Sequence, residues 1–430
     1  MPAKDLKHPK DTPDRHDRLI PAVPAYATAG IYMFFYHLAL SFLHLIGVGR
    51  PCPYKLGVRR DNNTVVGQSC RSLFYVLWNS RIPEGSRVLV TPFHHSSFVR
   101  MMRDSGRELV VCEQRNNELV EPTEYGPRDF NAVVITHMLG RDFECEWLKR
   151  WKRENPALLV IEDRVQGGLL SMEDPDLCDV SLYSTGQDKL PNFMGGGFAR
   201  VHSANHPTLY EDMATALEAL PFESAWARFT FLVKKIPTVL MYNWRPATIA
   251  ADALAHVLGF SRCALTDTYR KKNPGFMHHG FAIRPSAATL QSMDTVLETD
   301  TWEEMQRDCT RKFRLFLDNV DADVRAHVKP FAADTSCCYF FVRLPDCAES
   351  REMLAQRGII TISNQTYIAL SSKHAPILDD MVLLPSLMPL RSDEIKTLAK
   401  HVSDTWRVVG ADKMAQHTQP PVVHIQPTLV

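Results

Sequence analysis

The sequence predicts an α/β protein with a mostly parallel central sheet, helices on both faces of that sheet, and a smaller α+β domain towards the C-terminus. Between residues 65 and 201, short apolar runs rich in β-branched residues alternate with helical stretches. This alternation is the rhythm of βαβ units in a parallel sheet. After residue 288, helical patterns mix with short strands, which predicts the second, smaller domain.

The expected strands are continuous apolar runs rather than alternating ones. They cover residues 87–90, 109–112, 132–135 and 158–161, with a further strand of the smaller domain at 339–343. Continuous runs are typical of strands that are covered on both faces. Helices are expected at residues 97–105 and 143–154. Ligands of such sheets bind beyond the carboxyl ends of the strands, so the residues after each strand are the candidates for chemistry.

Composition sets the expected domain limits. Residues 1–30 are charged and Pro-rich, and the C-terminal stretch is polar and Pro-rich, so both ends are expected to be extended or disordered tails. The expected parts are a tail at 1–30, an apolar helical segment at 31–66, a large domain at 67–290 with a helical insertion at about 206–275, a small domain at 291–408, and a tail at 409–430.

Charge and cysteine content exclude several classes of function. Lys plus Arg equals Asp plus Glu at 49 each, so no global field favours nucleic acid. The ten cysteines form no CxxC pair, and no spacing matches a metal site. Reduced thiols and a polar N-terminus without a secretory signal favour a cytoplasmic protein.

Two apolar segments leave alternatives open. Residues 31–48 carry no formal charge, and His37, Ser41 and His44 fall on one helical face. The segment is predicted to be a buried helix in a dimer interface, an in-plane membrane contact or, at its marginal length, a span. Residues 229–244 combine Lys234 and Lys235 with aromatic residues, which is also typical of a peripheral membrane contact.

A carboxylate follows the expected strand at 158–161. Asp163 would be costly in such a buried position unless it meets a cation. The protonated pyridine nitrogen of pyridoxal phosphate (PLP) is such a cation, and a facing carboxylate keeps it protonated so that the ring withdraws electrons from the substrate. The alternative is an ordinary helix N-cap.

A lysine lies 26 residues further along. Lys189 follows Ser184 and precedes the glycines 195–197. A partly desolvated amine at this position suits a Schiff base with PLP, and Ser184 could reach the cofactor phosphate. A lysine before glycines is otherwise an ordinary surface loop, but the Asp and the Lys in this order indicate a PLP site together.

Two further pieces suit the same cofactor. Ser69 and Cys70 lead into an amphipathic helix, whose N-terminal amides and dipole favour a phosphate; an ordinary capped helix is the alternative. After the strand at 87–90, His95 is expected to stack on the pyridine ring. Adjacent histidines point to different faces and no third ligand is evident, so no metal is predicted.

These motifs resemble the DegT–DnrJ–StrS family of sugar-nucleotide aminotransferases, with gaps, from about residue 67 to residue 401. The resemblance implies a fold-type I PLP enzyme and a homodimer, with Lys189 as the Schiff-base residue and Asp163 at the ring nitrogen. It adds Gln166 to the cofactor-binding residues and His137 to those near the substrate. Residues 280–286 resemble the segment that reaches the partner subunit's site, which implies contacts there by His278, His279 and Arg284.

The chain departs from the family pattern at several positions. The stacking aromatic is His95, the usual phosphate-binding Asn is Ala282, and Arg164 stands where a small residue is usual. The resemblance implies transfer of an amino group from an amino acid to a keto substrate, by default a nucleotide- or lipid-linked keto-sugar. Alternatives are another PLP reaction at an amino-acid α-carbon (a lyase step or an acyl transfer) and a non-catalytic homologue acting as a partner protein.

Overall fold

The computed structural model describes most of the chain between residues 31 and 417. The described residues are 31–49, 63–115, 118–138, 143, 145–166, 174–186, 189, 194–202, 205–243, 246–247, 250, 253–254, 257–258, 281–297, 301–328, 340–359, 361–363, 367–373, 378–384, 387 and 390–417. The expected tail at 1–30 and the histidines 278 and 279 lie outside them.

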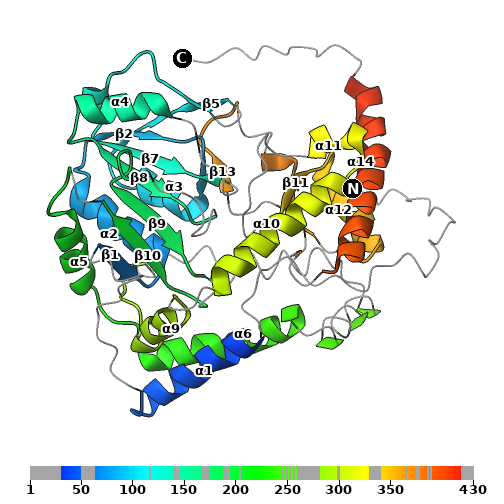
Figure 1. Cartoon of the computed structure of the whole chain (residues 1–430), viewed down its shortest axis with the longest axis horizontal. Coiled ribbons are helices and arrows are strands. Elements are labelled where there is room, and N and C mark those ends of the chain that lie inside the picture. Colours follow the sequence, from blue (N-terminus) through cyan, green and yellow to red (C-terminus); the bar gives the residue numbers. More distant parts are fainter. Residues whose placement is uncertain are drawn as a thin grey trace, which may run out of the picture.

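A seven-stranded sheet forms the centre of the large domain (Figure 1). Its strands lie in the order β1 (Thr64–Gly67), β10 (Gly197–Val201), β9 (Val180–Ser184), β8 (Leu159–Asp163), β7 (Ala132–Thr136), β2 (Arg87–Val90) and β4 (Glu108–Val111). Within this sheet β10 runs antiparallel to both of its neighbours, and the pairs from β9 to β4 are parallel. The four predicted strands are confirmed as β2, β4, β7 and β8, and β8 continues to Asp163.

Helices cover both faces of this sheet, as predicted. Alternate residues of one strand enter different cores: Val88 and Val90 belong to one apolar cluster and Leu89 to another. Each side chain so buried contributes about 1.5–3 kcal/mol, which explains why the strands are apolar on both faces. The first cluster is covered by α2 (Cys70–Arg81), α3 (Ser96–Arg103) and α5 (Leu209–Glu218), and the second by α4 (Glu146–Glu154).

The smaller domain has a three-stranded antiparallel sheet in the order β11 (Phe341–Arg343), β14 (Met381–Leu383), β12 (Ile362–Ser363). Four helices pack around one shared core: α10 (Thr301–Asn319), α11 (Ala322–Val328), α12 (Cys347–Gln356) and α14 (Ser392–His417). The strand expected at 339–343 is confirmed as β11. Helix α14 runs past residue 408, where a tail was expected to begin, because Val409 is still buried in the fold.

A layer of three helices lies along one end of the molecule (Figure 1): α1 (Ile31–Leu45), α6 (Ala225–Asn243) and α9 (Ala287–Leu297). We call it the helical layer. Its interior is an apolar cluster that includes Phe34 of α1 and Leu232 and Val239 of α6. Within the described residues, none of the helices is both long and apolar enough to cross a membrane.

Short elements complete the fold. A two-stranded sheet joins the two domains, because β3 (Phe93–His95) pairs with β13 (Tyr367–Ala369). A second two-stranded sheet contains β5 (Glu113–Arg115) and β6 (Glu118–Val120), and a 3₁₀ turn covers Pro127–Asp129.

Candidate active site

Asp163 and Lys189 come together at the carboxyl end of the central sheet. Asp163 is the last residue of β8, and Lys189 lies between β9 and β10; both are buried. Lys189 acts electrostatically on the Asp163 carboxyl group, and both act on the thiol of Cys70 at the beginning of α2. An amine, a carboxylate and a helix N-terminus therefore meet in one buried place.

The Asp163 carboxyl group is held in a dry, polar environment. Burial raises its pKa above the ordinary value, while the Val165 N–H, which donates to Oδ1 at 3.1 Å, and the Lys189 charge act in the opposite direction. The Thr136 hydroxyl also donates to Oδ2 at 3.4 Å. A cation that reached this carboxylate would be bound in a low-dielectric place, where ion pairs are strong.

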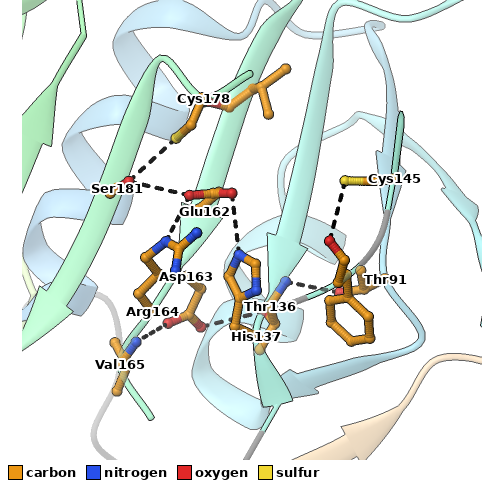
Figure 2. Close-up of polar contacts among 12 residues, drawn as sticks. Thr91, Thr136, His137, Cys145, Glu162, Asp163, Arg164, Val165, Cys178 and Ser181 are labelled. Atoms are coloured by element: carbon orange, nitrogen blue, oxygen red, sulfur yellow. Dashed lines mark hydrogen bonds and ion pairs between the residues drawn. The ribbon is translucent and has the colours of Figure 1, made fainter. Parts of the chain in front are cut away.

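His94 belongs to the hydrogen-bond network of Asp163 and Thr136. Its Nδ1 lies 2.8 Å from the Thr136 hydroxyl and its Nε2 lies 3.3 Å from the Thr91 hydroxyl. Thr91 Oγ1 accepts the Thr136 N–H at 3.0 Å (Figure 2). Burial lowers the pKa of His94 to about 4, so its ring is neutral near pH 7.

His95, the residue expected to stack on a cofactor ring, also has contacts within the protein. Its Nδ1 accepts the Ser97 N–H at 3.2 Å and caps helix α3, and its ring meets Tyr367 edge-on with 5.9 Å between centroids. Sequence reasoning chose between two adjacent histidines and missed the contact of His94 with the Asp163 network. Only strand alternation could have distinguished the two histidines, but Phe93–His95 is too short to show an alternating pattern.

Beside Asp163, a separate ionic network surrounds Glu162 (Figure 2). The Arg164 Nε donates to Oε2 at 2.7 Å, and His137 Nε2 lies 3.3 Å from Oε1. Burial by itself would raise the pKa of Glu162, but His137 and Arg164 hold it well below its usual range. His137 also stacks on Phe143. The imidazole expected near the substrate is therefore buried against Glu162, and Arg164, the departure from the family pattern, is its second ionic partner.

The beginning of α2 and the glycine-rich return lie against each other. Ser69 caps α2, because its hydroxyl accepts the Ser72 N–H at 3.1 Å, and Ser69 also bridges to Gly196. A Cβ at Gly197 would lie 2.4 Å from the backbone nitrogen of Cys70. Only glycine allows this approach, which brings the return strand to the N-terminus of α2, where a phosphate is favoured.

The remaining predicted residues lie at different places in the fold. Gln166 is buried in the turn after β8, and the Ser184 hydroxyl at the end of β9 accepts the Gly186 N–H at 3.3 Å. Arg284 contacts its own chain: its Nε donates to the Leu220 carbonyl at 2.8 Å, and its guanidinium lies 3.8 Å from the ring centre of Phe222. The expected contacts of histidines 278 and 279 fall outside the described residues.

No family model and no curated protein matches the sequence. Solved structures do match. The sugar aminotransferase CalS13 from Micromonospora echinospora is 14% identical, with a TM-score of 0.57 over 90% of this chain and 100% of that chain. NtdA from Bacillus subtilis, with bound cofactor PMP, is 12% identical, with a TM-score of 0.58 over 91% and 86%. DesI, in the presence of its TDP-sugar product, is 14% identical, with a TM-score of 0.55 over 95% and 96%.

The chain has the fold-type I architecture. The fold predicted from the sequence is thereby confirmed across both domains, since nine tenths or more of the chain are covered in each comparison. In this fold-type I chain, the buried Asp163 and Lys189 lie at the carboxyl end of the parallel strands, the edge at which ligands of open α/β sheets bind.

Proposed function

We propose that the chain is a PLP-dependent aminotransferase and a divergent relative of the DegT–DnrJ–StrS family. The observation that carries the proposal is the meeting of Lys189, Asp163 and the N-terminus of α2 in one buried place. Each group answers one part of the cofactor: an amine for the aldehyde, a carboxylate for the ring nitrogen and a helix N-terminus for the phosphate.

The residues present fit PLP by the chemistry of their donors and acceptors. Lys189 would hold the cofactor covalently through its amine, and Asp163 would hold the proton on the ring nitrogen. Ser69, Cys70 and Ser184 would bind the phosphate. The remaining assignments are Gln166 beside the ring and His95 at its face. When bound, PLP supplies an electron sink for negative charge at the α-carbon of an amino acid.

The reaction would use the chain's own groups for binding and proton movement. The Asp163 carboxylate, kept ionised in part by the donors from Val165 and Thr136, would keep the ring nitrogen protonated. Once an amino substrate has displaced Lys189 from its covalent link to the cofactor, the freed Nζ, with its side chain buried, would take the proton from the substrate α-carbon. Burial excludes water and makes the attraction between the Asp163 carboxylate and a protonated ring nitrogen stronger than in solution.

The substrate class is an amino-acid donor and a keto acceptor, by default a nucleotide- or lipid-linked keto-sugar. The TDP-sugar product of the similar structure DesI supports this choice. To test the proposed aminotransferase function, the protein is loaded with PLP and amino acids are added one at a time. A donor such as glutamate converts PLP to pyridoxamine phosphate and changes the absorbance. A PLP-loaded protein that no amino acid converts would favour lyase or acyl-transfer chemistry. Failure to bind PLP would favour a non-catalytic partner protein.

We also infer that the functional unit is a homodimer in which a second copy covers the outer face of the helical layer. In α1 the polar side chains of His37 and Ser41 are buried, and His44 Nε2 lies 2.9 Å from Gln291 Oε1 of α9. Although Phe34 and Leu40 are also buried, other apolar side chains of α1 point outwards: Phe42 is 46% exposed. Since an ordinary surface helix presents polar side chains on its outer face, the apolar outer face of α1 favours an apolar cover.

Aromatic side chains of α6 continue this outer face. The Phe229 ring lies 5.9 Å from Phe42 and 6.3 Å from Trp226, which is 63% exposed. A contiguous exposed apolar patch of this kind is typical of an interface. A second copy suits the uncharged surface of α1, because charged residues are depleted at the centre of protein interfaces.

The oligomeric state tests the homodimer. The wild-type chain is expected to sediment as a dimer, and the double variant Phe42→Asp, Trp226→Asp as a monomer, since two buried charges lack partners. Val408→Asp is the matched control, because the exposure of Val408 falls between those of Phe42 and Trp226 but it lies on α14. A monomeric wild type that co-sediments with anionic vesicles at low salt, and loses this binding in Lys234→Glu, Lys235→Glu, would replace the dimer by a peripheral membrane contact.

A further inference from the structure

The chain enters β10 through a strained segment, residues 194–196. Met194 has a φ of 58° and Gly195 a φ of 145°. A positive φ is unfavourable for a residue with a side chain, because the Cβ approaches the following carbonyl oxygen. The conformation of Met194 therefore persists only where its surroundings hold it.

The helical layer supplies these surroundings. The Met194 side chain is buried in the apolar cluster of the layer, between Phe34 of α1 and Leu232 and Val239 of α6. The Met194 carbonyl oxygen accepts a hydrogen bond from Arg228 Nη1 of α6 at 2.9 Å. Both the side chain and the backbone of this residue are thus fixed from helices far away in the sequence.

The next residue is fixed from both sides. A Cβ at Gly195 would lie 2.8 Å from Arg228 Nη1, so the guanidinium packs directly on the backbone of the return segment. On the other side, Thr185 Oγ1 donates to the Gly195 carbonyl at 2.8 Å. Thr185 follows β9 directly. Thr185 and Gly195, the two ends of the connection that contains Lys189 (the Lys189 loop), are therefore held together next to Arg228.

Burial of the Arg228 guanidinium is energetically unfavourable by itself. It is among the largest fully buried side chains in the described part of the chain, and burial lowers its pKa. Glu223 lies near enough to oppose this effect. A buried guanidinium gives little net stability compared with an apolar side chain of the same size. Its contribution is directional instead, because Nη1 donates to the Met194 carbonyl on the return from the residue that carries the proposed catalytic amine.

We propose that Arg228 is a positioning residue for Lys189: from the helical layer, it fixes the return of the Lys189 loop and so sets where the amine stands relative to Asp163. The proposal rests on the proposed function for the role of the amine. It also assigns a purpose to the helical insertion, whose outer face is the inferred dimer interface: α6 connects that interface to the site.

The test compares Arg228→Met with Arg351→Met. Arg351 is the matched control, because it too is a buried arginine that donates to a backbone carbonyl, that of Thr361 at 3.0 Å, but it lies in the small domain. The first measurement is hydrogen exchange of residues 185–197 in the protein without PLP. Faster exchange of this segment in Arg228→Met, with no change there in Arg351→Met, is the expected result. Equal exchange in the wild type and Arg228→Met would overturn the proposal.

The second measurement is the dissociation constant of PLP, with the lysine that borohydride fixes identified by peptide mapping. Arg228→Met is expected to bind PLP about tenfold more weakly and to show incomplete fixation at Lys189, whereas Arg351→Met behaves as the wild type. If Arg228→Met does not fold, Arg228→Lys replaces it: it keeps the charge, loses the planar fork and gives an intermediate effect. Unchanged exchange and PLP binding in Arg228→Lys and in Arg228→Met would contradict the proposal. A wild type that binds no PLP refutes the proposed function alone, since the exchange comparison still decides the role of Arg228 in the loop.

Discussion

Replacing Lys189 by alanine is expected to abolish the fixation of PLP by borohydride completely, while the protein still folds. Lys189 supplies the amine beside Asp163, and its methylene chain is small compared with the core around it. The measurement is the mass of the protein after reduction, together with its visible absorbance. Lys234→Ala is the control, because Lys234 is an exposed lysine of α6. Fixation that persists in Lys189→Ala would show that another lysine is the anchor.

Replacing Asp163 by asparagine is expected to leave PLP bound but to reduce turnover roughly a hundred- to a thousandfold, as the loss of a preorganised charge in an active site does. The amide has nearly the shape of the carboxylate, but it cannot hold the ring nitrogen protonated. Single-turnover conversion with the best amino donor measures the effect. Asp323→Asn, which alters a surface ion pair with Arg407, serves as the control. Turnover within a few fold of the wild type would remove Asp163 from the proposed mechanism.

The central sheet could be predicted because its strands are buried on both faces. Residues 132–135 and 158–161 are continuous apolar runs, and both enter two different clusters on the two sides of the sheet. The pairing of Asp163 with Lys189 was predictable for a related reason. Each follows or ends a parallel strand, and the carboxyl ends of neighbouring strands meet at one edge.

Side-chain partners across the fold could not be predicted in the same way. Sequence reasoning selected His95, but His94 contacts Thr136, which stands 42 residues away in the sequence. His137 was expected near the substrate, yet it pairs with Glu162 on the neighbouring strand. For the two histidines of β3, a one-residue change of position reverses the face to which a side chain points, whereas His137 follows the end of β7 and lies outside the strand.

The contact between Arg228 and Met194 was invisible for a different reason. The two residues stand 34 positions apart, in segments with no shared periodicity. From the apolar helical pattern of residues 229–244 we could infer only that some other apolar surface covers this helix. The end of α14 was misjudged because polar residues near residue 409 conceal buried ones such as Val409.

The position of α1 in the fold has a consequence for how the protein is made. Helix α1 leaves the ribosome before its partners α6 and α9, which begin at residues 225 and 287. At 5–20 residues per second, the wait is on the order of ten to forty seconds for α6. During this time both its apolar and its polar faces are uncovered. Nascent chains halted before α6 would therefore expose the apolar surface of α1 and bind chaperones. Release from the chaperones would coincide with synthesis of the helical layer.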